Sequence, residues 1–248
     1  MNAQRSSDSV PVSSWRSARL FVTDEFAAPP VILRVNDSVI GTLGNFSAST
    51  GKAKSKKTFN VCAIVAAAMT GGTVLNYSAS LPPERRRVLY VDTEQSRFHC
   101  KRVLCRILRL AGLPPDAHPP LLEFLCLRGY ATKERLRKIE EAIYDLDDLG
   151  LVVIDGIRDL AHDINSPGEA TDLITKLMQW TDERRIHIHT VLHLNKGDDN
   201  TRGHLGTELN NKAETVLQIT KDDFDRDISS VAAMHIRDRD FEPFAFRI

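Results

Sequence analysis

The chain has 248 residues, and its 33 Lys and Arg balance its 33 Asp and Glu, so the formal net charge is zero. Hydrophobic residues make up 42% and charged residues 27%, which indicates a folded globular protein and excludes a chain that is disordered throughout. The zero net charge also excludes attraction to nucleic acid by bulk charge, which leaves only a local basic patch for such a role.

The apolar runs are too short to cross a membrane. The best of them, residues 61–69, is about half of the roughly 18 residues that a span needs, and the polar N-terminus lacks the apolar core of an export signal. The cysteines show no C-x-x-C spacing, so we interpret them as reduced core thiols. They are Cys62, Cys100, Cys105 and Cys126. We therefore expect a cytoplasmic protein without a membrane partner.

The predicted elements begin after a flexible tail. Residues 1–14 are rich in Ser and poor in apolar side chains, and we expect residues 15–248 to form a single domain. Signals over residues 15–36 are mixed, and Pro29-Pro30 excludes a helix there. The predicted strands are residues 42–49, 87–92, 121–127, 151–154, 187–194, 215–220, 229–237 and 243–248. The predicted helices are residues 57–70, 96–111, 132–146 and 167–185.

The order of these elements predicts an α/β fold. Strands and helices alternate as far as residue 194, which is typical of a mostly parallel central sheet flanked by helices on both faces. The last three strands follow one another with only short polar turns between them. We expect them to form an antiparallel extension at one edge of the sheet.

The most informative segment is GKAKSKKT, residues 51–58, between a predicted strand and a buried helix. Gly51, Lys57 and Thr58 match the phosphate-loop template G-x-x-x-x-G-K-[S/T], and Lys56 stands in place of the second glycine. In such a loop, backbone N–H groups at the start of the helix wrap phosphate oxygens, and the lysine places a charge between the phosphates. The threonine hydroxyl can ligate Mg²⁺. The alternative interpretation is a basic surface loop before a helix.

The predicted nucleotide-binding residues extend through the loop into the helix. They are Gly51, Lys52, Ala53, Lys54, Ser55, Lys56, Lys57, Thr58 and Phe59.

Two acidic residues follow predicted strands. Glu94, in VDTEQS, is placed to orient and deprotonate an attacking water, although an acid there can also be a helix N-terminal residue. Asp155 directly follows an apolar strand and precedes Gly156, so we expect it to hold Mg²⁺ together with Thr58, with Asp159 as the fallback. The alternative for Asp155 is a capping role. Ligands bind at the carboxyl ends of strands in such sheets, where all these residues should meet.

With these motifs, the chain resembles the RecA-like P-loop ATPases, and within them the RepA-like and DnaB-like hexameric helicase group, AAA family ATPases of plasmids and mobile elements. The resemblance covers residues 40–248 and rests on GKAKSKKT, RVLYVDTEQS, LVVIDG and VLHLNKGDDNTRGHLGTELNNKAETVLQI. It implies ATP and Mg²⁺ as ligands, Glu94 as the catalytic glutamate and Asp155 as the Mg²⁺-linked aspartate. It also implies that His193 and Asn195 sense the γ-phosphate, while a satisfied histidine at a strand end is the alternative for His193.

The resemblance further implies contacts with other subunits and with DNA. The segment HIRDRDFEPFAF looks like the family's late basic pair, so Arg237 and Arg239 are candidate arginine fingers that reach the nucleotide of a neighbouring subunit. Residues 196–204 correspond to a channel-lining loop, in which Lys196 and Arg202 are candidate contacts for single-stranded DNA. Two aspartates in that loop oppose this charge.

Two functions follow from the sequence. The first is an ATP-binding and ATP-hydrolysing motor that forms a homo-oligomeric ring or filament and acts on DNA, as a helicase-like protein of replication or mobile-element maintenance. The second is a nucleotide-gated regulatory or DNA-binding module with little turnover, which the substituted Lys56 and the neutral charge favour. A small-molecule kinase fits poorly, because the sequence shows no arginine-rich lid segment.

Overall fold

The computed structural model describes residues 15–194 and 203–248, so the predicted tail at residues 1–14 lies outside the described residues. Its main sheet has eight strands in the order β12-β11-β10-β3-β9-β8-β6-β7. The six strands from β10 to β7 in this order run parallel to one another. The strands are β3 (Phe46–Gly51), β6 (Arg87–Asp92), β7 (Leu122–Cys126), β8 (Leu149–Asp155), β9 (His187–His193), β10 (Thr215–Lys221), β11 (Ile228–Ile236) and β12 (Phe244–Arg247).

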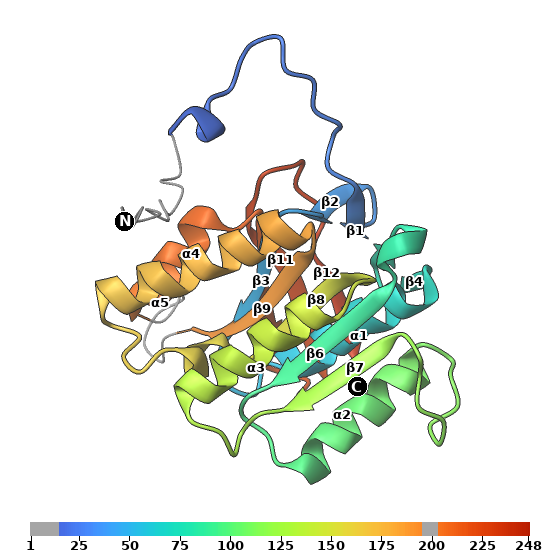
Figure 1. Ribbon diagram of the computed structural model, residues 1–248. Coiled ribbons are helices and arrows are strands. Elements are labelled where there is room, and N and C mark those ends of the chain that lie inside the picture. The colour runs from blue at the N-terminus through green and yellow to red at the C-terminus, as the bar shows by residue number, and fades with distance from the viewer. Residues whose placement is uncertain (1–14, 195–202) are drawn as a thin grey trace, which may run out of the picture.

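Helices cover both faces of this sheet (Figure 1). Helices α1 and α2 pack on one face, and α3, α4 and α5 pack on the other, each group with its own hydrophobic cluster. Successive strand residues divide between the clusters, as Tyr90 and Val91 do, because side chains alternate across a strand. The helices are α1 (Lys57–Thr70), α2 (Arg97–Leu110), α3 (Thr132–Asp145), α4 (Pro167–Arg184) and α5 (Gly203–Lys212), with short 3₁₀ turns η1 (Trp15–Ala18), η2 (Pro83–Arg85) and η3 (Ile157–Leu160).

The predicted fold class is therefore confirmed, including the antiparallel extension, because β11 pairs antiparallel with both β10 and β12. The parallel order brings the carboxyl ends of β3, β9, β8 and β6 to one edge of the sheet. Ligands of open α/β sheets bind at this edge.

A second, four-stranded sheet was not predicted from the sequence. It has the order β2-β1-β5-β4 with antiparallel pairing, and it shares the hydrophobic cluster of α1. Its strands are β1 (Val31–Val35), β2 (Ser38–Thr42), β4 (Thr73–Val74) and β5 (Tyr77–Ala79). The predicted strand at residues 42–49 was wrong at its start, because Thr42 ends β2 and β3 begins only at Phe46.

A chain of hydrogen bonds runs through the core beside β3. The Nδ1–H of His187 donates to the carbonyl oxygen of Thr42 (2.8 Å), which can only accept, so Nε2 of that ring accepts from Ser47 Oγ (2.7 Å). Ser47 Oγ then accepts from Nδ1–H of His189 (2.8 Å), whose Nε2 accepts from Ser49 Oγ (2.8 Å). One backbone carbonyl thus sets the tautomers of both histidines.

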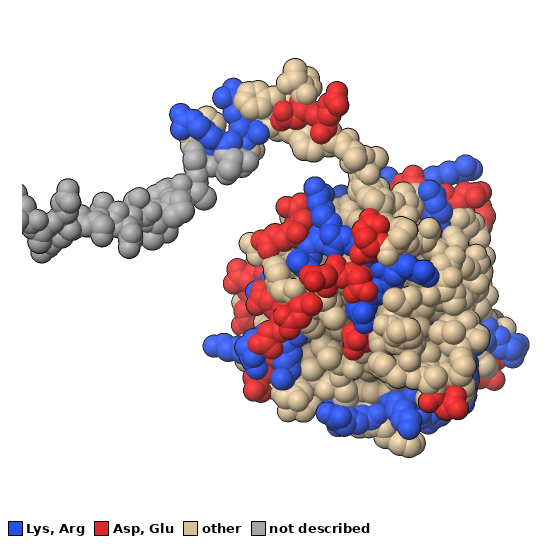
Figure 2. Space-filling model, turned by 45° about the vertical axis from the view of Figure 1, so that its right-hand side comes forward, with Lys and Arg blue, Asp and Glu red and all other residues tan. Residues whose placement is uncertain are grey.

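The chain enters the fold through an exposed arm. Residues 18–30 are all exposed, and the arm projects from the body of the molecule in Figures 1 and 2. On the face shown in Figure 2, Lys and Arg are interspersed with Asp and Glu, as the zero net charge leads one to expect. No helix within the described residues is long and apolar enough to cross a membrane.

Candidate active site

The predicted phosphate loop connects the end of β3 to the first residue of α1. Lys54 and Lys56 have left-handed backbone conformations there, with φ of 65° and 69°. A residue with a side chain is strained by roughly 1–2 kcal/mol in that conformation, whereas glycine adopts it freely. Lys56, which replaces the second glycine of the template, therefore occupies a position where glycine is the unstrained residue.

Gly51, the first glycine of the template, lies where no side chain fits. A Cβ atom at this position would lie 2.3 Å from the carbonyl oxygen of Ile219 and 2.5 Å from Oγ of Ser55. Both distances are far inside van der Waals contact, so any larger residue must displace the neighbouring strand β10 or the loop itself. The close approach of β10 explains why the loop begins with glycine.

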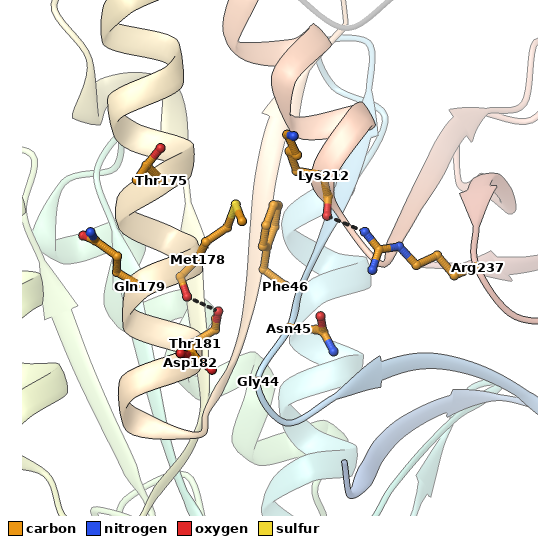
Figure 3. A pocket seen from close by; sticks show the side chains of 10 residues that line it. All are labelled: Gly44, Asn45, Phe46, Thr175, Met178, Gln179, Thr181, Asp182, Lys212 and Arg237. Carbon is orange, nitrogen blue, oxygen red and sulfur yellow. Dashed lines mark hydrogen bonds between the residues drawn. The ribbon is translucent and has the colours of Figure 1, made fainter. Parts of the chain in front are cut away.

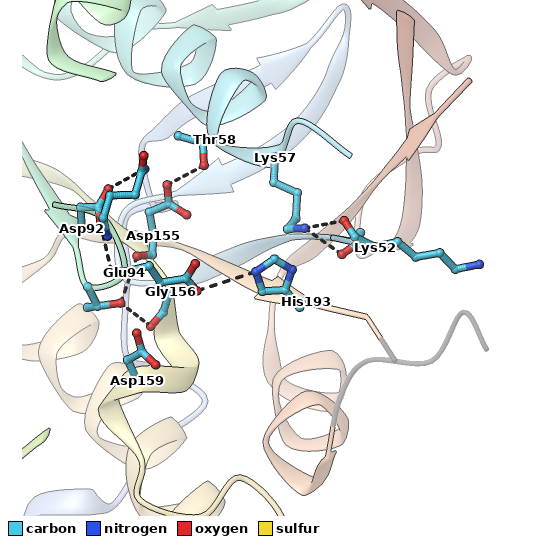
Figure 4. A network of polar contacts seen from close by, with 12 residues as sticks. Lys52, Lys57, Thr58, Asp92, Glu94, Asp155, Gly156, Asp159 and His193 are labelled. Atoms are coloured by element: carbon cyan, nitrogen blue, oxygen red, sulfur yellow. Dashed lines mark hydrogen bonds and ion pairs between the residues drawn. The ribbon is translucent and has the colours of Figure 1, made fainter. Parts of the chain in front are cut away.

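The Lys57 side chain folds back over the loop (Figure 4). Its ammonium group donates hydrogen bonds to the carbonyl oxygens of Gly51 (2.8 Å) and Lys52 (2.9 Å). Burial lowers the pKa of Lys57 to about 8, against the opposing charges of Asp155 and Glu94. The group is therefore still largely protonated at neutral pH and lies among the backbone groups that open α1.

Asp155, the last residue of β8, is joined to the phosphate loop by a hydrogen bond. Its Oδ2 accepts from Thr58 Oγ1 (2.9 Å) and from Tyr90 Oη (2.8 Å). Burial and, after it, the charge of Asp92 raise the pKa of Asp155 to about 6. The fallback, Asp159, instead lies 3.5 Å from the guanidinium of Arg135. The structure therefore brings Asp155, rather than Asp159, to the loop.

The pair of Thr58 and Asp155 fits a Mg²⁺ ion. A hydroxyl and a carboxylate are hard oxygen donors, and Mg²⁺ is commonly held by one or two such side chains together with phosphate oxygens and waters. No cluster of three His, Cys, Asp or Glu that could hold a metal occurs within residues 15–194 and 203–248. The donor set is thus too small for an all-protein metal cage and adequate for a nucleotide-bound ion.

The turn after β6 separates the roles of its two acids. Asp92 is fully buried and accepts from the backbone N–H groups of Glu94 (3.0 Å) and Gln95 (2.7 Å). Thr93 Oγ1 donates to the carbonyl oxygen of Gly156 (2.9 Å), which ties this turn to the end of β8. Asp92 therefore shapes the turn, and the half-exposed side chain of Glu94 is left to face the site.

His193 lies beside Glu94 at the carboxyl end of β9. Its Nε2 is 3.7 Å from Glu94 Oε1, a distance that fits an ion pair and is too long for a hydrogen bond. The interaction with His193 lowers the pKa of Glu94 against the effect of partial burial, so this carboxyl group is ionised at neutral pH. Gly51 pairs with His193 across the sheet, which places the histidine next to the phosphate loop. Asn195, Lys196 and Arg202 lie outside the described residues.

The remaining loop residues border a pocket of about 290 Å³ on the side of β10. Lys52, Ala53 and Ser55 line it together with Leu194 and residues 218–221. Phe59, by contrast, stacks on Phe246 of β12 with ring centroids 5.2 Å apart. Its side chain therefore packs against β12 and does not line this pocket.

The two candidate arginine fingers lie at the opposite edge of the sheet. Arg237 follows β11, donates from Nη2 to the carbonyl oxygen of Lys212 (3.1 Å), and lines a pocket of about 480 Å³ at the start of β3 (Figure 3). Arg239 is exposed in the loop that leads to β12. Neither residue is brought to the phosphate loop of its own chain, so both are separate from the cluster of Lys57, Thr58 and Asp155.

The arrangement at the carboxyl edge agrees with comparisons to known proteins. A family model described as AAA domain matches residues 16–199. The chain belongs to the AAA domain family. Among solved structures, the crystal structure of the RadB recombinase is similar with a TM-score of 0.57 and 15% identity, over 83% of this chain and 88% of that chain. At this identity the likeness shows the fold alone, which is RecA-like. No curated protein matches the chain.

Family and fold together support a RecA-like P-loop ATPase. Two side chains at its site were missed by sequence reasoning. Tyr90 lies in the apolar run RVLYVD, where the pattern predicts only a core residue. In the structure its hydroxyl donates a hydrogen bond to Asp155. Asp92 precedes Glu94 by two residues, and only the bonds it accepts show that it is structural.

Proposed function

We propose that the protein binds Mg²⁺–ATP at residues 51–58 and hydrolyses it. The observation that carries this proposal is the bond between Thr58 and Asp155, which joins the loop to the end of β8 within reach of Lys57. The start of α1 thereby supplies the cation Lys57 and the hydroxyl of Thr58 to one edge of the sheet. The ends of β8 and β6 supply the carboxylates of Asp155 and Glu94. Phosphoryl transfer needs little beyond such positioning and charge stabilisation.

Each side chain has a distinct part in this proposal. Lys57 and the N–H groups that open α1 bind the β- and γ-phosphate oxygens. Thr58 and Asp155 hold Mg²⁺, which neutralises phosphate charge when bound. Glu94, ionised beside His193, orients the attacking water and accepts its proton. His193 then lies where a side chain can respond to the γ-phosphate, and the pocket of about 290 Å³ beside the loop has room for the nucleoside.

Turnover measurements on matched lysine variants test the site. Lys57→Ala removes the buried ammonium and should lower ATP turnover by about 100-fold or more, because one charge-stabilising group is lost from the transition state. Lys133→Ala, an exposed lysine on α3 outside the loop, should leave turnover within about 3-fold of the unmodified protein. Equal rates for the unmodified protein and Lys57→Ala would remove the assignment.

We further propose that the motor works as a homo-oligomeric ring or filament on DNA, as a helicase-like protein of the RepA-like and DnaB-like group. The name of the similar RadB recombinase supports a role on DNA, and Lys196 and Arg202 are the proposed contacts. Arg237 and Arg239, far from their own phosphate loop, are proposed to reach the nucleotide of a neighbouring subunit, where such an arginine can accelerate hydrolysis ~10³-fold or more.

A mixing experiment tests the shared site. Arg237→Ala and Lys57→Ala are each expected to be nearly inactive alone. Mixed in equal amounts, they can form interfaces that combine an intact loop with an intact arginine, so part of the turnover should return. Light scattering with and without ATP and single-stranded DNA gives the size of the assembly. A strict monomer in every condition, or no recovery on mixing, contradicts the trans arrangement.

The second candidate function is a nucleotide-gated module with little turnover. Lys56 favours it, since a strained residue with a buried ammonium replaces the template's second glycine. This function predicts tight ATP binding with hydrolysis no faster than background, even with single-stranded DNA at high protein concentration. Turnover that depends on Glu94, lost in Glu94→Gln while ATP binding is kept, would select the motor instead.

A further inference from the structure

Two cysteines from different elements meet behind the turn that carries Glu94. Cys100 lies in the first turns of α2, and Cys126 is the last residue of β7. Their Sγ atoms are 3.3 Å apart, and each lies 3.5 Å from the carbonyl oxygen of Gln95. Both are free thiols. A disulfide needs an S–S distance of ~2.05 Å, so the two sulfurs have to approach each other by only about 1.2 Å to form it.

The two thiols differ in access. Cys100 is only 4% exposed, whereas Cys126 is half-buried and lines an open pocket of about 540 Å³ with Arg97, Arg128 and Tyr130. Burial raises the pKa of the Cys100 thiol, which keeps it protonated. Cys126 is therefore the sulfur that meets a dissolved oxidant first, and Cys100 is the one placed behind it.

We propose that Cys126 and Cys100 are a paired oxidation site, which closes to a reversible disulfide on reaction with a peroxide. Cys126, as its thiolate, attacks one peroxide oxygen; the O–O bond breaks, and the products are a sulfenic acid on Cys126 and, after protonation, water. The Cys100 sulfur then attacks the sulfenic sulfur, the S–O bond breaks, and the Cys100 proton passes to the departing oxygen, which leaves as a second water. Two thiols and one hydrogen peroxide thus give one disulfide and two waters.

The position of the pair gives the disulfide a consequence for the site. The bond would tie the start of α2 to β7 across the turn in which Asp92 holds Glu94 and Gln95. Closing the sulfurs on each other also moves them relative to the Gln95 carbonyl oxygen. We expect this to displace Glu94, so oxidation should lower ATP turnover. This second step rests on the proposed hydrolytic function, whereas the disulfide itself does not.

Mass spectrometry of the full chain tests the disulfide directly. After hydrogen peroxide treatment, the denatured, non-reduced protein should lose two hydrogens, about 2 Da, and yield a cross-linked peptide pair that contains Cys100 and Cys126. A thiol reductant should reverse both changes. Cys126→Ser should abolish the loss, whereas Cys105→Ser, at a half-buried cysteine of the helix that carries Cys100, should keep it. No loss of mass, or a bridge to Cys62 or Cys105, overturns the proposal.

Turnover measured on the same samples separates the two claims. Turnover of the oxidised protein should fall at least several-fold and recover on reduction, while Cys126→Ser should be insensitive to the same treatment. A chain that forms the disulfide but never hydrolyses ATP contradicts the proposed function and leaves the oxidation site standing. Unchanged turnover in a fully cross-linked, active protein contradicts the displacement of Glu94.

Discussion

Two polar regions lie along β3, one within the core and one at its carboxyl end. In the core, the hydrogen bonds that run from Thr42 to Ser49 give each ring nitrogen of His187 and His189 a partner. Both rings are fully buried, and burial lowers the pKa of each, so both stay neutral near pH 7. The polar groups of this region thus satisfy one another's hydrogen bonds within the core.

The phosphate loop is built in the opposite way. Buried polar atoms of Ser55, Lys56 and His193 have no hydrogen-bond partner within the described part of the chain. A missing partner does not by itself mark a site, since it is also found at Asn60 Nδ2, Thr215 Oγ1 and Ser229 Oγ. At the loop, however, such atoms gather beside strained backbone and a buried cation. The core therefore satisfies its polar groups internally, while the loop keeps several polar atoms without a partner among the described residues, as the proposed ligand site would need.

The largest effect on stability is expected from a side chain added at Gly51, in the phosphate loop. Gly51→Ala places a Cβ 2.3 Å from a backbone oxygen of β10, so we expect a loss of about 3 kcal/mol in the free energy of unfolding. Gly129→Ala is the matched control, because no atom lies within 4 Å of its added Cβ, and its change should stay within about 0.5 kcal/mol. Urea unfolding curves measure both, and similar losses would contradict the close approach at Gly51.

Two buried serines provide the second test. Ser47→Ala removes the hydroxyl that bonds both histidine rings and leaves a buried N–H of His189 without an acceptor, so unfolding free energy should fall by about 2 kcal/mol. Ser55→Ala removes a hydroxyl that has no partner among the described residues and should cost less than about 0.5 kcal/mol. Equal costs, measured by denaturation, would show that the two regions do not differ as described.

The pH dependence of stability tests the core region. Burial lowers the pKa of His189 from 6.5 to about 3, so below pH 6.5 the unfolded chain binds a proton that the folded chain does not. Stability should fall as pH drops from 6.5 towards 3, by up to about 1.4 kcal/mol per pH unit from this group, and should be unaffected above that window. His187 acts in the same direction, while Asp155, with its raised pKa, acts in the opposite one.

A variant isolates the contribution of His189. His189→Gln removes only this titration, so its curve of unfolding free energy against pH should be flatter below pH 6.5 than that of the unmodified protein. Identical slopes for the two proteins would mean that the ring is already charged in the fold.

The smallest effect is expected from the loop lysines. Lys56→Gly relieves a left-handed residue and removes a buried ammonium, which together should stabilise the fold by about 1 kcal/mol after the entropy cost of glycine. Lys54→Gly relieves the same strain at an exposed position, so its net change should stay within about 0.5 kcal/mol. Thermal unfolding of the pair measures the difference, and a destabilised Lys56→Gly would contradict it.

Much of the fold could be predicted because its elements carry strong patterns. The buried strand at residues 87–92 and the helix at residues 57–70 appear with the predicted bounds. The small sheet was missed because its strands have two to five residues, too few for any periodicity to show. It forms only because distant segments, such as Leu33 and Ala79, pair across the sequence.

The candidate site was predictable where spacing fixes chemistry. Lys57 and Thr58 follow from the template, and Asp155 follows from its place after an apolar strand; the structure brings the three together. The bond from Tyr90 to Asp155 depends on strand register, which no local pattern encodes. The roles of Arg237 and Arg239 stay predictions, because they depend on a second copy of the chain.

The Lys57 ammonium donates hydrogen bonds to the carbonyl oxygens of Gly51 and Lys52. These two oxygens therefore compete with any bound anion for the ammonium group. An incoming anion must exchange with two internal acceptors, so the observed affinity is weaker than the intrinsic attraction by the free energy of that exchange. Under the proposed function, a monoanion would gain little from such an exchange, whereas a polyphosphate would also engage the amides of α1 and the proposed metal ligands Thr58 and Asp155. Under the proposed function, the loop is therefore expected to discriminate between anions by their charge.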